Sequence, residues 1–150
     1  MQTIIINTEN RYYKQMINTF YNWWKDIKKI SYEEIYNQYL PTLNKEELPN
    51  LYGIIINDTL IAMYEINEKD GIDDEPYEPY IASIYVMEEY RHQGYLNIIM
   101  EDACNKIKEM GYKKAYLHSK HENLYERYGF KMFKEVTTKQ GKKRLFEKEL

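Results

Sequence analysis

Apolar and polar positions alternate along this chain with two different periods, which predict strands and helices in turn. Thr3 to Ile6 is a short β-branched run typical of a strand. Apolar residues then recur three or four positions apart and predict one amphipathic helix. The members of that pattern are Tyr13, Met16, Ile17, Phe20, Trp23, Trp24 and Ile27. Ser31 and Glu34 have the spacing of a capping box, so a second helix is expected to begin there and to end before Pro41.

The middle of the chain has the pattern of a sheet. Leu51–Ile56 and Leu60–Ile66 flank the compact polar segment Asn57–Thr59, which predicts an antiparallel hairpin. Glu68–Pro79 is acidic, contains two prolines and is expected to be a loop. Ile81–Val86 is too apolar for an edge strand, so a central position in the sheet is predicted.

The second half predicts a long helix that ends at Gly111. Its apolar stripe consists of Ile99, Ala103, Ile107 and Met110. The remaining pattern predicts a strand at Lys113–His118, a short helix at Leu124–Tyr128, and two strands at Phe130–Thr138 and Lys142–Glu149 that pair across Gln140–Gly141. The order β-α-α-β-β-β-α-β-α-β-β indicates an α/β (α+β) fold with a mixed, mostly antiparallel sheet flanked by helices.

Length and composition favour a single soluble domain. A chain of 150 residues is long enough to bury most of its apolar surface, so one domain over residues 1–150 is expected. The lone Cys104 cannot form an internal disulfide and is expected to be a buried apolar residue. The sequence has no charged-then-apolar leader and no run of about eighteen apolar residues, which favours a cytoplasmic location without a membrane partner.

The charge balance argues against nucleic-acid binding. The net charge is −3, with 24 acidic and 21 basic residues, so no overall basic field exists. The 17 tyrosines are spread along the chain without interleaved basic residues, which is unlike a base-stacking surface. No metal site is expected, because the three histidines and one cysteine do not fall at ligand spacing. His92, His118 and His121 are interpreted as loop and strand residues, and Trp23 with Trp24 as core packing.

The segment YRHQGYLNIIM, residues 90–100, is the most informative part of the sequence. It places a glycine-bearing turn between a predicted strand and the beginning of a predicted helix. The first amides of a helix have no intrahelical partner and carry the positive end of the helix dipole, so they can bind an anionic phosphate. Gly94 allows the backbone to approach such a group closely. A single glycine in this position is also common in ordinary turns, so the segment alone leaves both interpretations open.

A second segment, LHSKHENLYERYGF, lies about thirty residues downstream, and together the two resemble the GCN5-related N-acetyltransferase (GNAT) family. The resemblance extends from about Leu51 to Phe133 and implies acetyl-CoA as co-substrate. It implies that the turn binds the pyrophosphate, that Asn97 adds a side-chain donor, and that the amides of Ile84 and Val86 bind the pantetheine arm. The turn residues are Arg91, His92, Gln93, Gly94, Tyr95 and Leu96. Leu96 departs from the family, which prefers glycine or alanine there.

The resemblance also implies direct acyl transfer with two acid–base residues. Tyr125 would lie beside the coenzyme's sulfur and donate a proton to the departing thiolate, because a phenol's usual pKa of about 10 is close to a thiol's of about 8.5. Glu65 is the candidate base, acting directly or through water, with Glu78 as the second choice. His118 occupies a position where many members have an asparagine, and Asn123 is the nearby amide that can replace it.

The favoured function is therefore an acetyl-CoA-dependent N-acetyltransferase that acts on a primary amine, either a small cationic molecule or a peptide N-terminus. The alternative is a coenzyme-A-binding regulatory or catalytically degenerate module. The acidic loop contains four carboxylates, which are either solvated surface or a means of attracting a cationic acceptor. They are Asp73, Asp74, Glu75 and Glu78. The oligomeric state is open, with a homodimer as one candidate.

Overall fold

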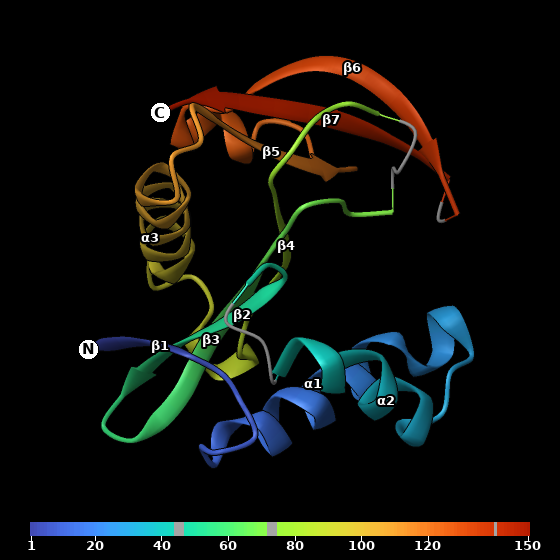
Figure 1. Ribbon diagram of the computed structural model, residues 1–150, viewed down its shortest axis with the longest axis vertical. Coiled ribbons are helices and arrows are strands. Elements are labelled where there is room, and N and C mark those ends of the chain that lie inside the picture. Colours follow the sequence, from blue (N-terminus) through green and yellow to red (C-terminus); the bar gives the residue numbers. More distant parts are fainter. Residues whose placement is uncertain (44–46, 72–74, 140) are drawn as a thin grey trace.

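One sheet with helices on both faces organises the protein (Figure 1). The computed structural model describes residues 1–43, 47–71, 75–139 and 141–150, which form seven strands and three α-helices. The strands are β1 (Gln2–Ile5), β2 (Asn50–Ile56), β3 (Thr59–Asn67), β4 (Tyr80–Val86), β5 (Lys114–Ser119), β6 (Lys131–Thr138) and β7 (Gly141–Glu149). The helices are α1 (Tyr12–Lys28), α2 (Tyr32–Leu43) and α3 (Tyr95–Glu109), with the 3₁₀ helices η1 (Glu88–Tyr90) and η2 (Tyr125–Tyr128).

The strand order is β1-β2-β3-β4-β5-β7-β6. Every neighbouring pair is antiparallel except β4 and β5, which run parallel. The expected mixed, mostly antiparallel sheet is therefore confirmed, and β4 is a central strand as predicted. Asn57 and Asp58 connect β2 and β3 with positive φ angles of 49° and 60°, a backbone conformation suited to a tight hairpin turn.

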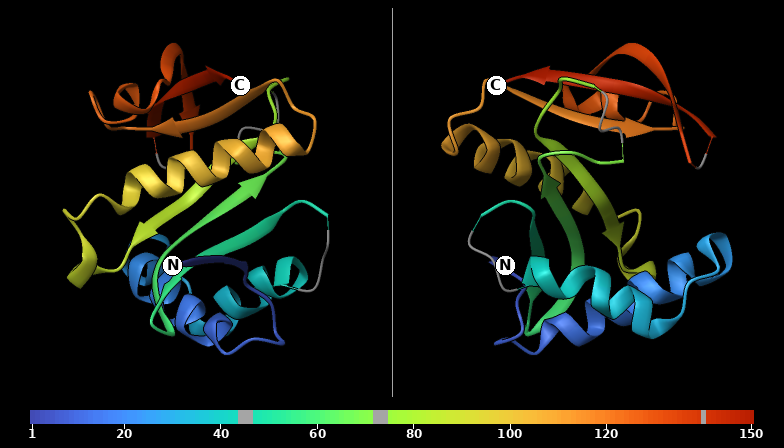
Figure 2. Two further views of the ribbon diagram at one scale, coloured as in Figure 1. Left: turned by 90° about the vertical axis from the view of Figure 1, so that its left-hand side faces the viewer. Right: turned by 45° about the vertical axis from the view of Figure 1, so that its right-hand side comes forward.

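The parallel contact between β4 and β5 is short. Within the described residues, these two strands pair only at Tyr80 with Tyr116. Beyond that pair the strands diverge, so that β5, β6 and β7 form a separate blade, as Figures 1 and 2 show. In the described part of the chain, the divergence leaves most of one edge of β4 without a neighbouring strand.

The two faces of the sheet bury different helices, as the opposite positions of α3 and the α1–α2 pair show in Figure 2. On one face α3 packs through Ile99, Ala103 and Ile107. On the other face α1 and α2 pack through residues such as Phe20 and Tyr39, whose rings stack with centroids 4.7 Å apart. Burial of these apolar stripes stabilises the helices far more than their intrinsic propensity does.

The second helix begins as predicted but ends later. The amide of Ser31 donates to Glu34 Oε2 over 2.7 Å, and the Glu34 amide donates to Ser31 Oγ over 3.1 Å, so the capping box is formed. The prediction that the helix ends before Pro41 was wrong, because α2 continues to Leu43. Thr42 and Leu43 are buried, and this packing offsets the one backbone hydrogen bond that a proline removes near a helix end.

Two further expectations needed correction. Met110 lies beyond the end of α3 and is 40% exposed, so the buried stripe ends at Ile107. The short helix expected at Leu124–Tyr128 is a 3₁₀ helix that begins at Tyr125 and ends at Tyr128, followed by Gly129, whose φ is 86°. Four residues are too few for a stable α-helix, and the tighter 3₁₀ turn suits a short connector.

Candidate functional site

A cleft of about 780 Å³ opens where β4 and β5 diverge. Its lining comes from the ends of α1 and α2, from β3, β4 and β5, from η2 and from the β6–β7 hairpin. Both predicted catalytic residues, Glu65 and Tyr125, line this one cleft, together with Ile84. Parts of the chain sixty residues apart thus meet around a volume typical of small-molecule sites.

Glu65 is a buried carboxylate at the floor of the cleft. On β3, Met63 and Glu65 are two residues apart and face the α1–α2 side, so the strand's alternation directs the carboxylate into the cleft. Its side chain accepts a hydrogen bond at Oε2 from Ser83 Oγ over 2.8 Å. With its amide nitrogen turned towards Glu65, Asn67 donates to Oε1 over 2.8 Å.

Burial raises the pKa of Glu65 from 4.5 to about 7, because the charged form loses solvation. The hydrogen bonds from Ser83 and Asn67 stabilise the charged form and partly oppose that rise, as does the positive charge of Lys28. A carboxylate with a pKa near neutrality can take a proton and release it again at physiological pH. Glu65 therefore has the properties of a general base.

Ser83 lies at a bulge in β4. The register between β3 and β4 shifts between Met63 and Glu65, and Ser83 has a φ of 50°, a left-handed conformation that is uncommon for a residue other than glycine. Such a conformation costs on the order of 1–3 kcal/mol and persists where surrounding contacts fix it. Here it directs the serine hydroxyl at Glu65.

The open edge of β4 presents backbone amides to the cleft. The Met87 amide donates to Ile61 of β3 over 2.9 Å. Because amides alternate between the two edges of a strand, those of Ile84 and Val86 face the side from which β5 has diverged. Their role towards a pantetheine arm stays a prediction. The Val86 carbonyl is occupied, since it accepts a hydrogen bond from Arg91 Nε over 3.0 Å.

The glycine turn leads from η1 into α3. Gly94 is the N-cap of α3 with a φ of 87°, and a Cβ placed on it would meet no atom within 4 Å. His92 also has a positive φ, of 61°. The space beside Gly94, at the beginning of α3, is therefore open, and a helix N-terminus favours an anionic group such as a pyrophosphate.

Side chains of the turn brace it or pack beneath it. Arg91 lies over the Tyr85 ring, 5.2 Å from its centroid, and Gln93 Nε2 donates to the Glu89 carbonyl over 3.1 Å. Tyr95 and Leu96 are half-buried against the core on the α3 side. Leucine at position 96 thus contributes to packing.

Asn97 is exposed in the first turn of α3. Its backbone amide donates to the Gly94 carbonyl over 3.1 Å, so the side-chain amide is the group of Asn97 that can meet a ligand. None of the residues from Arg91 to Asn97 lines the 780 Å³ cleft. The turn and the cleft therefore lie at two ends of the open β4 edge.

Tyr125 is 8% exposed and is the first residue of η2. Its ring packs against Phe146, with centroids 6.1 Å apart. Burial raises the pKa of Tyr125 to about 12, with a smaller contribution from Tyr128. The phenol therefore keeps its proton at neutral pH and is a weaker acid than a free tyrosine.

His118 is bound to an aspartate. Its Nε2 lies 2.8 Å from the backbone carbonyl and 2.7 Å from Oδ2 of Asp70. Both of those groups accept, so Nε2 carries the hydrogen and the ring ties β5 to the β3–β4 connection. Asn123 is exposed with a φ of 59° and does not line the cleft.

The acidic loop is described only in part, since Asp73 and Asp74 lie outside the described residues. The Glu75 carboxylate accepts from Lys134 Nζ over 2.8 Å, and Glu78 lies 3.9 Å from Lys69 Nζ. Neither Glu75 nor Glu78 lines the cleft. Of the carboxylates in the described part of the chain, those of Glu65 and Asp70 line its wall.

Several cleft residues were not identified from the sequence. They are Asn67, Asp70, Tyr39 and the lysines at positions 28, 120, 139 and 143. Tyr39 is buried near Glu65, whose negative charge adds to the effect of burial in raising the phenol's pKa. No spacing pattern joins these residues, because α1, α2 and the β6–β7 hairpin meet only in the folded chain.

Within the described ranges, no group of three or more His, Cys, Asp or Glu side chains is arranged to bind a metal ion. The helices in those same ranges are too short or too polar to span a membrane.

Comparison with known proteins supplies independent evidence. The sequence model of the Acetyltransferase (GNAT) family matches residues 17–130. No curated protein gives a significant match. Solved structures share the fold at low identity. An aminoglycoside 6′-N-acetyltransferase complexed with coenzyme A is 13% identical, has a TM-score of 0.76, and aligns over 99% of this chain and 97% of its own.

Two other solved structures show the same architecture. A spermidine N-acetyltransferase chimera from Vibrio cholerae is 15% identical with a TM-score of 0.73, over 99% of this chain and 96% of that one. A GNAT family acetyltransferase from Elizabethkingia anophelis with acetyl-CoA bound is 22% identical with a TM-score of 0.58, over 78% and 82%. At these identities the likeness concerns the fold.

Proposed function

Because this chain belongs to the acetyltransferase (GNAT) family, we propose that it transfers an acetyl group from acetyl-CoA directly to a primary amine. The family match confirms the resemblance drawn from the glycine turn and the tyrosine segment. The observation that carries the proposal is the cleft at the divergence of β4 and β5, on whose wall Glu65 and Tyr125 both lie. We further propose that residues 1–150 act as one domain in the cytoplasm.

The donor is proposed to lie along the open edge of β4. Its pyrophosphate would meet the amides above Gly94, with the exposed side chains of His92 and Asn97 beside it. The amides of Ile84 and Val86 would bind the pantetheine arm as an added strand binds, and one of them would polarise the thioester oxygen. Acetyl-CoA supplies the activated acetyl group.

The chain's own residues move the protons. The acceptor amine enters as an ammonium and must lose a proton before nitrogen can attack the carbonyl carbon. Glu65 takes that proton, directly or through a water ordered by Ser83. The C–N bond then forms and leaves one more proton on the nitrogen than the amide product carries. As the C–S bond breaks, the thiolate receives the Tyr125 proton, and the proton released from the nitrogen returns to the phenol through water.

The raised pKa of Tyr125 affects the last step. A phenol with a pKa of about 12 transfers its proton unfavourably to a thiolate whose acid has a pKa of about 8.5. Tyr125 therefore first donates a hydrogen bond that stabilises the developing thiolate. Transfer of the phenol's proton to sulfur is completed when the proton released from the amine nitrogen reaches the phenol. Asn123, exposed and away from the cleft, is at most a peripheral contact for the coenzyme.

A thiol-release assay tests the function. The intact protein is incubated with acetyl-CoA and a panel of primary amines, and free coenzyme A is measured with a thiol reagent. Amine-dependent release above the hydrolysis rate supports the proposal. An acetyl-CoA titration that leaves the melting midpoint unchanged, together with no release, contradicts it, since any ligand of the folded state raises that midpoint by mass action.

A further inference from the structure

Among the residues that the structure describes, the wall of the cleft carries more positive than negative side chains. Lys28 at the end of α1, Lys120 after β5, and Lys139 and Lys143 of the β6–β7 hairpin all line it, against the carboxylates of Glu65 and Asp70. The whole chain has a net charge of −3. A cationic concave surface on a negatively charged protein is a local arrangement that favours anionic ligands.

Lys28 and Lys120 both lie close enough to Lys143 to repel its charge. Burial lowers the pKa of Lys143, and the positive charges of Lys120 and Lys28 lower it further, while Asp70 acts in the opposite direction. Lys120 Nζ lies 3.9 Å from the position that a Cβ on Gly141 would occupy, which places it beside the start of β7.

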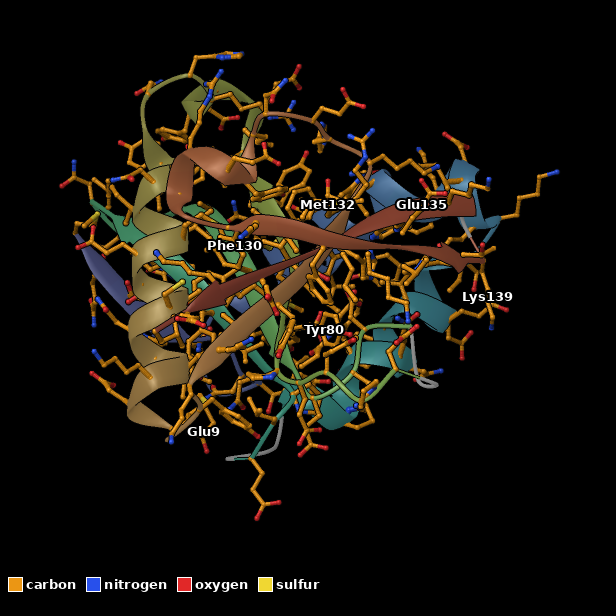
Figure 3. All side chains as sticks on the ribbon, turned by 90° about the horizontal axis from the view of Figure 1, so that it is seen from above. Glu9, Tyr80, Phe130, Met132, Glu135 and Lys139 are labelled. Atoms are coloured by element: carbon orange, nitrogen blue, oxygen red, sulfur yellow. The ribbon has the colours of Figure 1, made fainter. Side chains whose placement is uncertain are left out.

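The fold brings these positions together from distant parts of the chain. Figure 1 shows the free end of the β6–β7 hairpin on the same side of the molecule as α1 and α2, with α3 on the opposite side. In Figure 3, Lys139 marks that end of the hairpin and Phe130 marks the end near α3, with Tyr80 between them. Lys139 therefore lies on the same side of the molecule as α1, the helix that carries Lys28.

Other basic residues of the β6–β7 hairpin form ion pairs with carboxylates. Lys142 pairs with Glu135 over 3.8 Å, Arg144 with Glu122, and Lys134 with Glu75. Among the described residues, no carboxylate forms an ion pair with Lys28, Lys120, Lys139 or Lys143. Lys28 Nζ lies over the Trp24 ring, 4.4 Å from its centroid. Repulsion among nearby lysines raises the free energy of the folded protein, and a bound anion lowers it again.

We propose that the acceptor carries an acidic group, a carboxylate or a phosphate, in addition to its primary amine, and that Lys28, Lys120 and Lys143 bind that group. The inference rests on the proposed acetyltransferase function. The amine then faces Glu65, and the apolar part of the acceptor lies against Trp23 and Trp24, whose rings stack with centroids 4.6 Å apart. An amino acid has this chemistry, whereas a polyamine does not.

Matched pairs of amines test the proposal. Lysine and cadaverine, tyrosine and tyramine, or phosphoethanolamine and ethanolamine differ only in the acidic group. The parent enzyme should acetylate the acid-bearing member of at least one pair with a kcat/KM at least tenfold above that of its partner. The lysine and tyrosine pairs test a carboxylate, and the ethanolamine pair tests a phosphate.

Charge-removing variants connect the preference to the lysines. Lys120→Gln and Lys143→Gln should each raise KM for the acid-bearing acceptor about ten- to hundredfold, the effect of losing a charge-assisted contact of about 1.4–3 kcal/mol. They should leave KM for acetyl-CoA and for the matched neutral-tailed amine unchanged. Lys142→Gln is the control, because Lys142 is on the same hairpin but faces Glu135.

Two results overturn the proposal while leaving the acetyltransferase function intact. In the first, the parent enzyme acetylates amines of the panel but none of the acid-bearing members. In the second, Lys120→Gln and Lys143→Gln raise KM for acetyl-CoA and leave KM for the acceptor unchanged. That result would show that these lysines bind the phosphates of the coenzyme. Absence of any acetyl-CoA binding would instead refute the proposed function itself.

Discussion

Ser83 donates a hydrogen bond from Oγ to Oε2 of Glu65 over 2.8 Å, across two adjacent strands. The bulge in β4 that makes this contact possible also gives Ser83 its positive φ. One local distortion thus positions the candidate base and orients the open edge of β4.

Replacing Ser83 separates its hydroxyl from its backbone conformation. Ser83→Ala and Ser83→Gly both remove a hydrogen bond to the charged form of Glu65, so the pKa of Glu65 should rise further. In both variants the midpoint of the acidic limb of the pH–rate profile should therefore lie above the parent's midpoint, which is near pH 7. Glycine accepts a positive φ, so Ser83→Gly should unfold with a free energy about 1 kcal/mol higher than Ser83→Ala. Ser119→Ala, a cleft serine without a contact to Glu65, should leave the profile unchanged.

Glu65→Gln tests the base. A glutamine has the same shape but cannot take a proton, so kcat should fall by about 10²-fold. This is the lower end of the range for loss of a general base, because water can partly replace the carboxylate as proton acceptor. The parent rate should rise with pH to a plateau above about pH 7, and the variant should lose that rise. A variant with the parent's profile would assign the titration to another group.

The same substitution affects stability in a pH-dependent way. The pKa of Glu65 is about 7 in the folded protein and 4.5 as its ordinary value, so the folded state binds more protons between these two pH values. The free energy of unfolding should therefore fall as pH rises from about 4.5 to about 7, by a total on the order of 3 kcal/mol at about 1.4 kcal/mol per pH unit. In urea unfolding at pH 5 and pH 8, Glu65→Gln should lose most of that difference.

Tyr125→Phe tests the proton donor. The ring still packs against Phe146, so the melting-midpoint shift on acetyl-CoA binding should remain while kcat falls about 10²–10⁴-fold. Tyr128→Phe is the matched control on the same 3₁₀ helix and should be nearly as active as the parent. Equal activity of both variants would limit Tyr125 to packing.

The coenzyme turn can be tested with two glycines at opposite ends of α3. Gly94 and Gly111 have φ angles of 87° and 94°, and a Cβ on either meets no atom within 4 Å. Gly94→Ala and Gly111→Ala should therefore each destabilise the protein by about 1 kcal/mol. Only Gly94→Ala should weaken the acetyl-CoA-dependent shift, because its new Cβ enters the proposed phosphate space, and Gly94→Val should abolish the shift.

A loss of the acetyl-CoA shift in both glycine variants would indicate a general effect of destabilisation. Retention of the full shift in Gly94→Val would place the pyrophosphate elsewhere. Leu96→Gly provides a further comparison, since Leu96 packs beneath the turn and its removal should reduce stability without reducing coenzyme affinity.

Hydrophobic periodicity in the sequence was sufficient to predict the order of strands and helices. The capping box at Ser31 and the polar turn at Asn57 are local signals, because their hydrogen bonds and dihedral angles involve residues only a few positions apart. Family-specific motifs likewise marked the glycine turn and Tyr125. Each of these features is encoded in a short stretch of chain, so it can be recognised without knowledge of the fold.

The divergence of β4 from β5, and therefore the cleft, depended on tertiary structure. The charges of Lys28, Lys120 and Lys143 meet across more than a hundred positions, and no periodic pattern connects them. The pKa values of Glu65 and Tyr125 followed from burial by helices and strands distant in sequence. Residue types and their local conformations are properties of the sequence, but solvation and the field at a site arise from all the segments that pack around it.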